Sequence, residues 1–311
     1  MNNVGLLIFI FNLLLPVRLI FYVINQPLFV FRYSFFCAII FSMDKFLTDF
    51  HMHSVLSGDA KSANEDNVIS AVEKGCKYIA LTEHCNLDFL KHGYHEITTT
   101  DLALYDGGYK RLKKKYAGQI EIAYGLEIGY DPQLAREYSD IIKKYGYDYI
   151  INSIHLINGV DSYWNTFFHG RTQKEAYEEY LGAIYESLSA PYRFDSIGHF
   201  GYVTRTGPYT CRDMFKGYEN HIEAILKKMI EKGVILELNT NLRDAPPPCL
   251  PQKEIVKLYK ELGGELVIFG SDAHHSSHIC NAREQVMSLL KECGFKYHCI
   301  FIGKKREMIK I

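Results

Sequence analysis

A chain of 311 residues with 48% apolar and 23% charged residues can bury a large core, which excludes an intrinsically disordered protein. Its formal net charge of -1 provides no basic field for a polyanion, so we expect a small substrate and no nucleic acid partner. The eight cysteines form no CxxC pair, which indicates reduced thiols rather than zinc ligands and favours a cytoplasmic location.

The first 43 residues differ in composition from the rest of the chain. Residues 4–42 are almost entirely apolar, and Arg18 and Arg32 are their only charged residues. The apolar runs at 4–17, 19–30 and 35–41 are each shorter than the roughly 18 to 20 residues of a spanning helix. Three interpretations stay open: an upstream start assignment with Met43 as the initiator, a membrane anchor, and a processed targeting segment. We expect a membrane association only if residues 1–43 are retained.

Residues 44–311 are predicted to form one domain of alternating strands and helices. This alternation is typical of parallel strands joined by helices, and seven repeats predict a closed or nearly closed barrel. The predicted strands are 46–50, 78–82, 120–125, 149–153, 194–198, 234–238 and 266–270. Amphipathic helices are predicted at 64–74, 134–144, 174–188, 214–232 and 252–262, among others.

Polar residues of the types that bind metals follow almost every predicted strand. Because catalytic groups of such barrels sit at the carboxyl ends of the strands, we expect these residues to converge on one mouth. The pairs His51 and His53, and Asp272 and His274, are alternate residues of chain predicted to be extended, so each pair faces one site. The whole set is His51, His53, Glu83, His84, Glu127, His155, His199, Asp272 and His274, while the sixth strand ends in Asn239 and Asn241.

Together these residues predict a metal centre. Any one of the histidines alone is better explained as a partly buried polar residue, but buried imidazoles and acids in a cluster are costly without an ion. Imidazoles with carboxylates suit zinc, iron or manganese, and a carboxylate such as Glu127 can bridge two ions. We expect two or three divalent ions, which would hold a phosphate ester and activate a water for its hydrolysis.

The motifs resemble those of the PHP (polymerase and histidinol phosphatase) family, over essentially all of residues 44–311. The resemblance implies an α/β fold, a distorted seven-stranded (β/α)7 TIM-like barrel with a trinuclear metal site at the carboxyl ends of the strands. It rests on six motifs in the family's order: Asp49-Phe-His51-Met-His53-Ser54, Thr82-Glu83-His84, Gly125-Leu-Glu127-Ile, Ser153-Ile-His155, Ile197-Gly-His199 and Gly270-Ser-Asp272-Ala-His274.

Carried over motif by motif, the resemblance implies a ligand set for each ion. The first ion would be held by His51, His53, Glu127 and Asp272, the second by Glu127, His155 and His199, and the third by Asp59, His84 and His274. Asp59 has an alternative interpretation as a turn residue beside Gly58. Glu83 is expected to orient a ligand rather than to bind metal.

Within the family the chain is similar to the monofunctional histidinol-phosphatases, which hydrolyse histidinol phosphate in the penultimate step of histidine biosynthesis. Residues 167–171 and 175–181 resemble that subgroup. Arg171 and Arg205 are candidates for binding the phosphate, although either could be a surface arginine. A metal-bound water would attack phosphorus, so no side-chain nucleophile is expected. The alternatives are a PHP phosphoesterase acting on another small phosphate ester or nucleotide, and a non-catalytic metal-binding scaffold.

Overall fold

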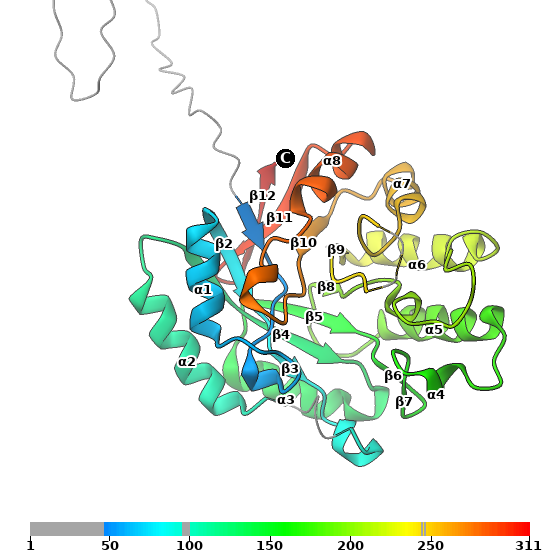
Figure 1. Cartoon of the computed structure of the whole chain (residues 1–311), viewed down its shortest axis with the longest axis horizontal. Coiled ribbons are helices and arrows are strands. Elements are labelled where there is room, and N and C mark those ends of the chain that lie inside the picture. Colours follow the sequence, from blue (N-terminus) through cyan, green and yellow to red (C-terminus); the bar gives the residue numbers. More distant parts are fainter. Residues whose placement is uncertain (1–46, 95–99, 244, 246) are drawn as a thin grey trace, which may run out of the picture. The chain divides into compact units, whose positions relative to one another are not determined.

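The computed structural model describes residues 47–94, 100–243, 245 and 247–311, and its centre is a sheet of parallel strands. Seven strands follow one another around this sheet, and β3 (His84–Cys85) pairs with β4 beside them (Figure 1). In spatial order they are β1 (Leu47–Asp49), β2 (Cys76–Leu81), β4 (Glu121–Gly129), β5 (Tyr149–Ser153), β8 (Ser196–Ile197), β9 (Ile235–Asn239) and β10 (Val267–Gly270). Each overlaps a predicted strand, so the predicted strand order is confirmed.

Backbone hydrogen bonds close the barrel between the ends of its first and last strands. The Phe50 N–H donates to the carbonyl of Phe269 at 3.0 Å, and the Asp272 N–H donates to the carbonyl of His51 at 2.7 Å. The His53 N–H donates to the carbonyl of Ala273 at 2.8 Å. Two segments about 220 residues apart in sequence are therefore held side by side where both strands end.

Helices surround the strands, as Figure 1 shows. Long helices are α1 (Asn64–Glu73), α2 (Leu102–Lys115), α3 (Ala135–Tyr145), α5 (Gln173–Ser187), α6 (Glu219–Lys232), α7 (Lys253–Glu261) and α8 (Arg283–Glu292), and α4 (Asn165–Phe168) is a single turn. The five predicted helices are present, but α6 begins five residues later than the predicted 214. The reason is Gly217, whose φ of +91° is incompatible with a right-handed helix. The apolar face of α2 is built largely from tyrosines, including Tyr105 and Tyr109, which obscures its period in the sequence.

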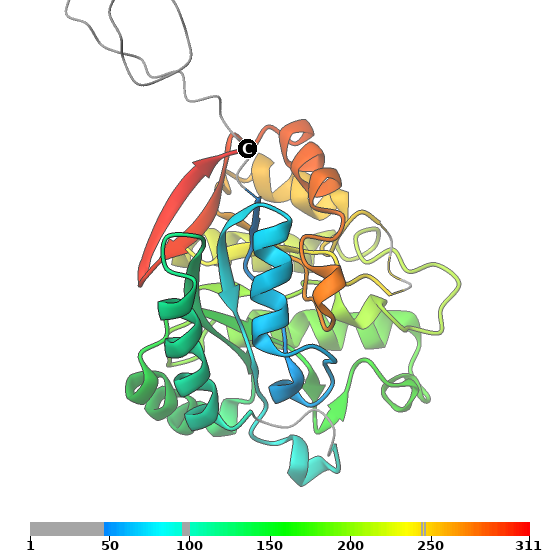
Figure 2. The same ribbon diagram turned by 60° about the vertical axis from the view of Figure 1, so that its left-hand side comes forward.

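A C-terminal hairpin that the sequence analysis did not predict covers the barrel interior at the amino ends of the strands. Strand β11 (Tyr297–Ile302) pairs antiparallel with β12 (Lys305–Lys310), and Figure 2 shows the two strands along one edge. Phe301 of β11 packs on Tyr149, with ring centroids 4.9 Å apart. Ile235, the first residue of β9, belongs to the same apolar cluster. The hairpin thus seals one end of the barrel and leaves the other for the site.

A second small hairpin, β6 (Leu156–Ile157) with β7 (Val160–Asp161), follows β5. The predicted extension at residues 1–43 lies outside the described residues. Within the described ranges, no helix has the length and apolar character needed to cross a bilayer.

Candidate metal centre

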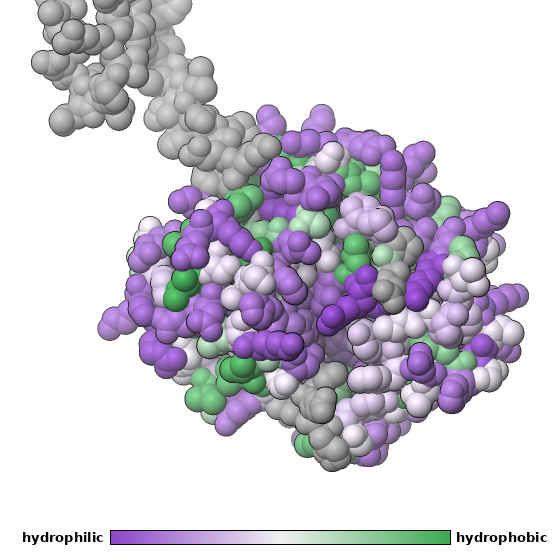
Figure 3. Space-filling view, in the orientation of Figure 1, coloured by the Kyte–Doolittle hydropathy of each residue, from purple (hydrophilic) through white to green (hydrophobic). Residues whose placement is uncertain are grey.

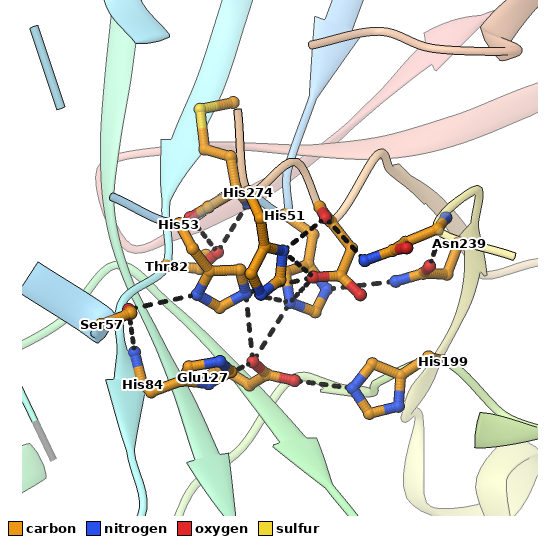
Figure 4. Close-up of polar contacts among 12 residues, drawn as sticks. His51, His53, Ser57, Thr82, His84, Glu127, His199, Asn239 and His274 are labelled. Atoms are coloured by element: carbon orange, nitrogen blue, oxygen red, sulfur yellow. Dashed lines mark hydrogen bonds and ion pairs between the residues drawn. The ribbon is translucent and has the colours of Figure 1, made fainter. Parts of the chain in front are cut away.

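All nine predicted ligands come together at the carboxyl ends of the strands. Figure 4 shows His51, His53, His84, Glu127, His199 and His274 directed toward one another. Glu127 lies within β4, because that strand continues to Gly129 through its pairing with β5. His84 begins β3 and lies opposite Glu127 in the register of these two strands. The remaining three ligands are Asp59, His155 and Asp272, and each contacts a member of the group.

The backbone at Asp272 differs from the extended chain that the sequence predicted. Asp272 has a φ of +51°, in the left-handed region that Asp tolerates better than most residues. Its side chain nevertheless reaches the site, because the Asp272 N–H is fixed by the carbonyl of His51. His199 also has a positive φ, of +23°. Tertiary contacts therefore hold two of the predicted ligands in uncommon backbone conformations.

The first group of donors is formed by His51, His53 and Asp272, whose ligand atoms lie within 4.8 Å of one another. The Nε2 atoms of His51 and His53 are 3.0 Å apart. The Asp272 Oδ1 lies 3.2 Å from the Nε2 of His53. All three side chains are buried.

Glu127 stands between this group and a second one. Its Oε2 lies 3.3 Å from the Nε2 of both His51 and His53. Its Oε1 lies 2.8 Å from the Nε2 of His199 and 3.4 Å from that of His155. The two oxygens of this fully buried carboxylate therefore face different groups of imidazoles, which is the arrangement of a bridging ligand.

The third group lies toward the pocket opening and contains Asp59, His84 and His274. The Asp59 Oδ2 is 3.0 Å from the Nε2 of His274 and 3.6 Å from that of His84. The loop that carries Asp59 is held by Glu83, which accepts hydrogen bonds from the hydroxyls of Ser54 and Ser57 at 2.6 and 2.5 Å. Glu83 itself does not point into the donor cluster but fixes the segment that does.

Hydrogen bonds on the far side of three imidazoles show that the donor set fits a cation. The Nδ1 of His51 lies 2.5 Å from Glu237 Oε1, that of His155 lies 3.2 Å from Asn86 Oδ1, and that of His274 lies 2.9 Å from the carbonyl of Asp272. Because each Nδ1 faces an acceptor and carries the proton, each Nε2 presents a lone pair to the cluster.

A close contact at the centre of the cluster supports the same conclusion. The Nδ1 of His84 and the Oε2 of Glu127 are 2.8 Å apart, yet neither atom has a hydrogen-bond partner among the described residues. Buried polar atoms normally have such partners. A bound cation would supply the contact that this buried nitrogen and this buried oxygen lack.

The electrostatics of the cluster favour bound positive charge. Burial alone would raise the pKa of Glu127, but the neighbouring His51, His84 and His155 outweigh it and lower that pKa well below its usual range. Burial would lower the pKa of His84, but Glu127 and Asp59 outweigh it and raise that pKa to about 10. The carboxylates are therefore held ionised, and a divalent cation would supply the compensating charge.

These motifs and this geometry agree with one protein family. Residues 49–241, more than half of the chain, match the family model of the PHP domain. The chain belongs to the PHP family.

This PHP protein is similar to two relatives that are named histidinol-phosphatases. It is 30% identical over 260 residues to the histidinol-phosphatase of Lactococcus lactis subsp. lactis, an alignment that covers 83% of this chain and 95% of the relative. It is 27% identical over 247 residues to the histidinol-phosphatase of Bacillus subtilis, covering 72% and 90%.

A solved structure extends the likeness to three dimensions. A crystal structure of the L. lactis histidinol phosphate phosphatase in complex with zinc, L-histidinol and phosphate superimposes with a TM-score of 0.75 at 28% identity. The match covers 84% of this chain and 98% of the L. lactis chain. The whole PHP barrel described above is therefore shared with that enzyme.

A pocket of about 230 Å³ opens onto the PHP metal-ligand cluster. Figure 3 shows a hollow bordered by hydrophilic residues where the arrowheads of β4 and β5 lie in Figure 1. Beyond the donor residues, the pocket is lined by Phe89, Asp161, Tyr163, Trp164, Tyr202, Arg205, Asn241 and Arg243.

The two predicted phosphate-binding arginines have different surroundings. Arg205 lines the pocket, is buried, and donates from Nη2 to Asp272 Oδ2 at 2.8 Å and Asn239 Oδ1 at 2.9 Å. Arg171 is not among the pocket residues; its Nε donates to Glu179 at 2.8 Å and its Nη1 to the carbonyl of Phe167. The structure brings Arg205 to the PHP site and leaves Arg171 outside it.

Sequence reasoning missed three polar residues of the PHP site. Glu237 lies between the apolar residues Leu236 and Leu238 of β9, and a lone acid in such a run was the available signal. Asp161 and Arg243 lie in loops where nothing in the sequence distinguishes them from surface residues. In the structure Asp161 is not a surface residue, because it is only 1% exposed. Its Oδ2 also has no hydrogen-bond partner within the described ranges.

Proposed function

We propose that this protein is a phosphoric monoester hydrolase that converts L-histidinol phosphate to L-histidinol and phosphate, in the penultimate step of histidine biosynthesis. The observation that carries the proposal is the shared pocket: the donor cluster, a buried arginine and a buried carboxylate with one oxygen unpartnered among the described residues all face one volume of about 230 Å³. The zinc, histidinol and phosphate bound by the L. lactis relative support the same assignment.

The cluster would hold two or three divalent ions, of zinc, iron or manganese. We assign His51, His53, Glu127 and Asp272 to the first, Glu127, His155 and His199 to the second, and Asp59, His84 and His274 to the third. When bound, such ions neutralise phosphate oxygens and make a nucleophile available from water near neutral pH. Because hydrolysis then needs no side-chain nucleophile, the protein's own task is to position both ends of the substrate.

Arg205 is placed to bind the phosphate end. Its Nη2 is occupied by Asp272 and Asn239, but its buried Nε has no hydrogen-bond partner among the described residues. The guanidinium also lies over the ring of Tyr202, 5.0 Å from its centroid, which fixes its plane. A planar donor group with free N–H capacity next to the cluster suits a phosphate oxygen.

Asp161 is placed to bind the cationic end of the substrate. L-Histidinol phosphate carries an ammonium group and an imidazole, and Asp161 presents a buried carboxylate oxygen without a partner to a pocket lined by Phe89, Tyr163 and Trp164. Aromatic walls suit a flat ring, and a carboxylate suits a cation. Burial raises the pKa of Asp161 to about 6, so the group is ionised above that pH and can bind the cation.

Asp161→Asn is expected to lower kcat/KM for L-histidinol phosphate by roughly 10- to 100-fold, because a hydrogen bond between charged groups contributes about 1.5–3 kcal/mol. Hydrolysis of an aryl phosphate, whose aryl group is uncharged and offers no cationic end, should change by less than about threefold. Steady-state kinetics with both esters test this. An equal loss with the two substrates would remove Asp161 from substrate recognition and leave it a structural role.

The function itself is tested by phosphate release from L-histidinol phosphate by the full chain loaded with zinc or manganese, beside sugar phosphates, nucleotides and an aryl phosphate. A clear preference for histidinol phosphate is expected. Preference for another small phosphate ester would retain the metal chemistry and overturn the substrate assignment. No turnover of any ester by the metal-loaded protein would favour a non-catalytic scaffold.

We also propose that residues 44–311 are the catalytic domain, since every residue named for the site lies within the described part of that range. A chain beginning at Met43 should then match the full chain in kcat and KM for histidinol phosphate. Loss of activity in the shorter chain, with its circular dichroism spectrum unchanged, would show that residues 1–42 contribute to catalysis.

A further inference from the structure

A carboxylate that belongs to none of the proposed ligand sets lies against the donor cluster. Glu237 is the middle residue of β9 and is fully buried. Its Oε1 lies 2.5 Å from the Nδ1 of His51, and its Oε2 accepts the backbone N–H of His199 at 2.5 Å. The Oε2 also accepts the side-chain N–H of Asn239 at 3.2 Å. One carboxylate thus joins a residue that follows β1 to a residue that follows β8.

The contact between Glu237 and His51 occupies space that is free only because residue 270 is a glycine. A Cβ at Gly270 would lie 2.5 Å from both the Oε1 of Glu237 and the Cβ of His51, closer than real Cβ atoms approach. Any side chain at this position would therefore displace the Glu237–His51 pair. A glycine inside a strand often marks such a close approach.

Two other glycines, at the end of β4 and just after β8, open space for contacts of the same kind. A Cβ at Gly129 would lie 2.3 Å from Asn86 Oδ1, the group that faces the Nδ1 of His155. A Cβ at Gly198 would lie 2.2 Å from the hydroxyl of Ser153, which donates to Glu127 Oε1 at 2.6 Å. Three polar groups therefore support the ligands at these glycines, and Glu237 is the only carboxylate among the three.

We propose that Glu237 is a positioning residue, which keeps the proton of His51 on Nδ1 and holds the backbone of His199, so that the Nε2 atoms of both imidazoles face the metal. This inference rests on the proposed function, because it concerns the affinity of the same metal site. His199 has a strained backbone with a φ of +23°, and the hydrogen bond from its N–H to Glu237 holds it in that conformation.

The two contacts require a carboxylate and not an amide. Both oxygens of Glu237 accept hydrogen bonds, one from an imidazole N–H and one from a peptide N–H. In Glu237→Gln, one of these positions becomes an NH2 group, which can only donate. If the NH2 faces His51, it moves the imidazole proton to Nε2 and removes the metal-binding lone pair; if it faces His199, two N–H groups meet.

The test is a competition titration of Zn²⁺ between metal-free full-length protein and a chromophoric chelator, with denaturant unfolding of each metal-free variant alongside. Glu237→Gln should weaken zinc binding by roughly 10- to 100-fold, the usual effect of losing a partner of a metal-binding histidine. The matched control is Asp148→Asn. Asp148 is buried away from the cluster, and its carboxylate accepts the backbone N–H of Tyr124 at a distance of 3.0 Å. This substitution should lower stability without changing the affinity for zinc.

Unchanged zinc affinity in Glu237→Gln, with or without a loss of stability, would overturn the inference while leaving the proposed function intact. Failure of the wild-type chain to bind zinc would overturn the metal site and the proposed function together. If the Glu237→Gln variant does not fold, spectra of the wild-type protein alone still test the inference. Nitrogen-15 spectra of the zinc-loaded protein should show His51 protonated at Nδ1 and coordinated at Nε2, and the opposite tautomer would overturn it.

Discussion

His53→Ala is expected to lower kcat for phosphate release by about 10³-fold or more while the barrel stays folded, since metal ions supply several kcal/mol of transition-state stabilisation. His53 is buried at the centre of the first donor group, 3.0 Å from the Nε2 of His51 and 3.2 Å from Asp272 Oδ1. Its removal leaves Glu127 Oε2 and Asp272 Oδ1 without one of the imidazoles that face them. The bound metal per chain, measured after dialysis, should fall with the activity.

A matched control separates this effect from the loss of any buried imidazole. His298 in β11 is fully buried, both its ring nitrogens lack hydrogen-bond partners among the described residues, and burial lowers its pKa to about 3. His298→Ala should reduce thermal stability and leave kcat and metal content near those of wild type. Near-normal turnover in His53→Ala, or an equal loss in both variants, would contradict the metal assignment.

Arg205→Ala is expected to raise KM for histidinol phosphate and to lower kcat/KM by roughly 10²-fold, because hydrogen bonds from a charged donor to phosphate contribute about 1.5–3 kcal/mol each. The residue also donates to Asp272, so metal content must be measured in the same preparation. If metal content is retained and kcat/KM still falls, the loss belongs to substrate binding. Arg205→Lys should recover only part of it, because a lysine ammonium lacks the planar pair of donors.

Arg171→Ala is the control for that experiment. Arg171 pairs with Glu179 at 2.8 Å and lies over the ring of Phe167, 4.7 Å from its centroid, outside the residues that line the pocket. We expect KM to stay within about twofold of wild type, as for a surface ion pair that contributes little. A rise in KM as large as that of Arg205→Ala would instead place Arg171 at the substrate. An unchanged KM in Arg205→Ala would remove Arg205 from the substrate site.

The sequence by itself determined the barrel and the residues that meet at its mouth. Its seven apolar runs, each followed by a polar residue such as His155 or His199, were enough to predict the barrel and the position of the site. The reason is that parallel strands place their carboxyl ends at one side of the barrel. The convergence of eight ligands from His51 to His274 follows from that rule, whereas Asp59 was implied by the family resemblance. Local signals also placed five helices within a few residues of their ends, except where Gly217 interrupts the predicted start of α6.

Only the tertiary structure decided what lies around and beneath those ligands. In the sequence Arg171 and Arg205 are equivalent candidates, because a long charged side chain can reach solvent or a buried site from similar loops; packing placed only Arg205 in the pocket. Glu237 and Asp161 acquire their chemistry from burial and from partners far along the chain, such as His51, 186 residues away. Contacts of that separation leave no periodic signal, so the ligands were predictable, whereas the roles of Glu237 and Asp161 were not.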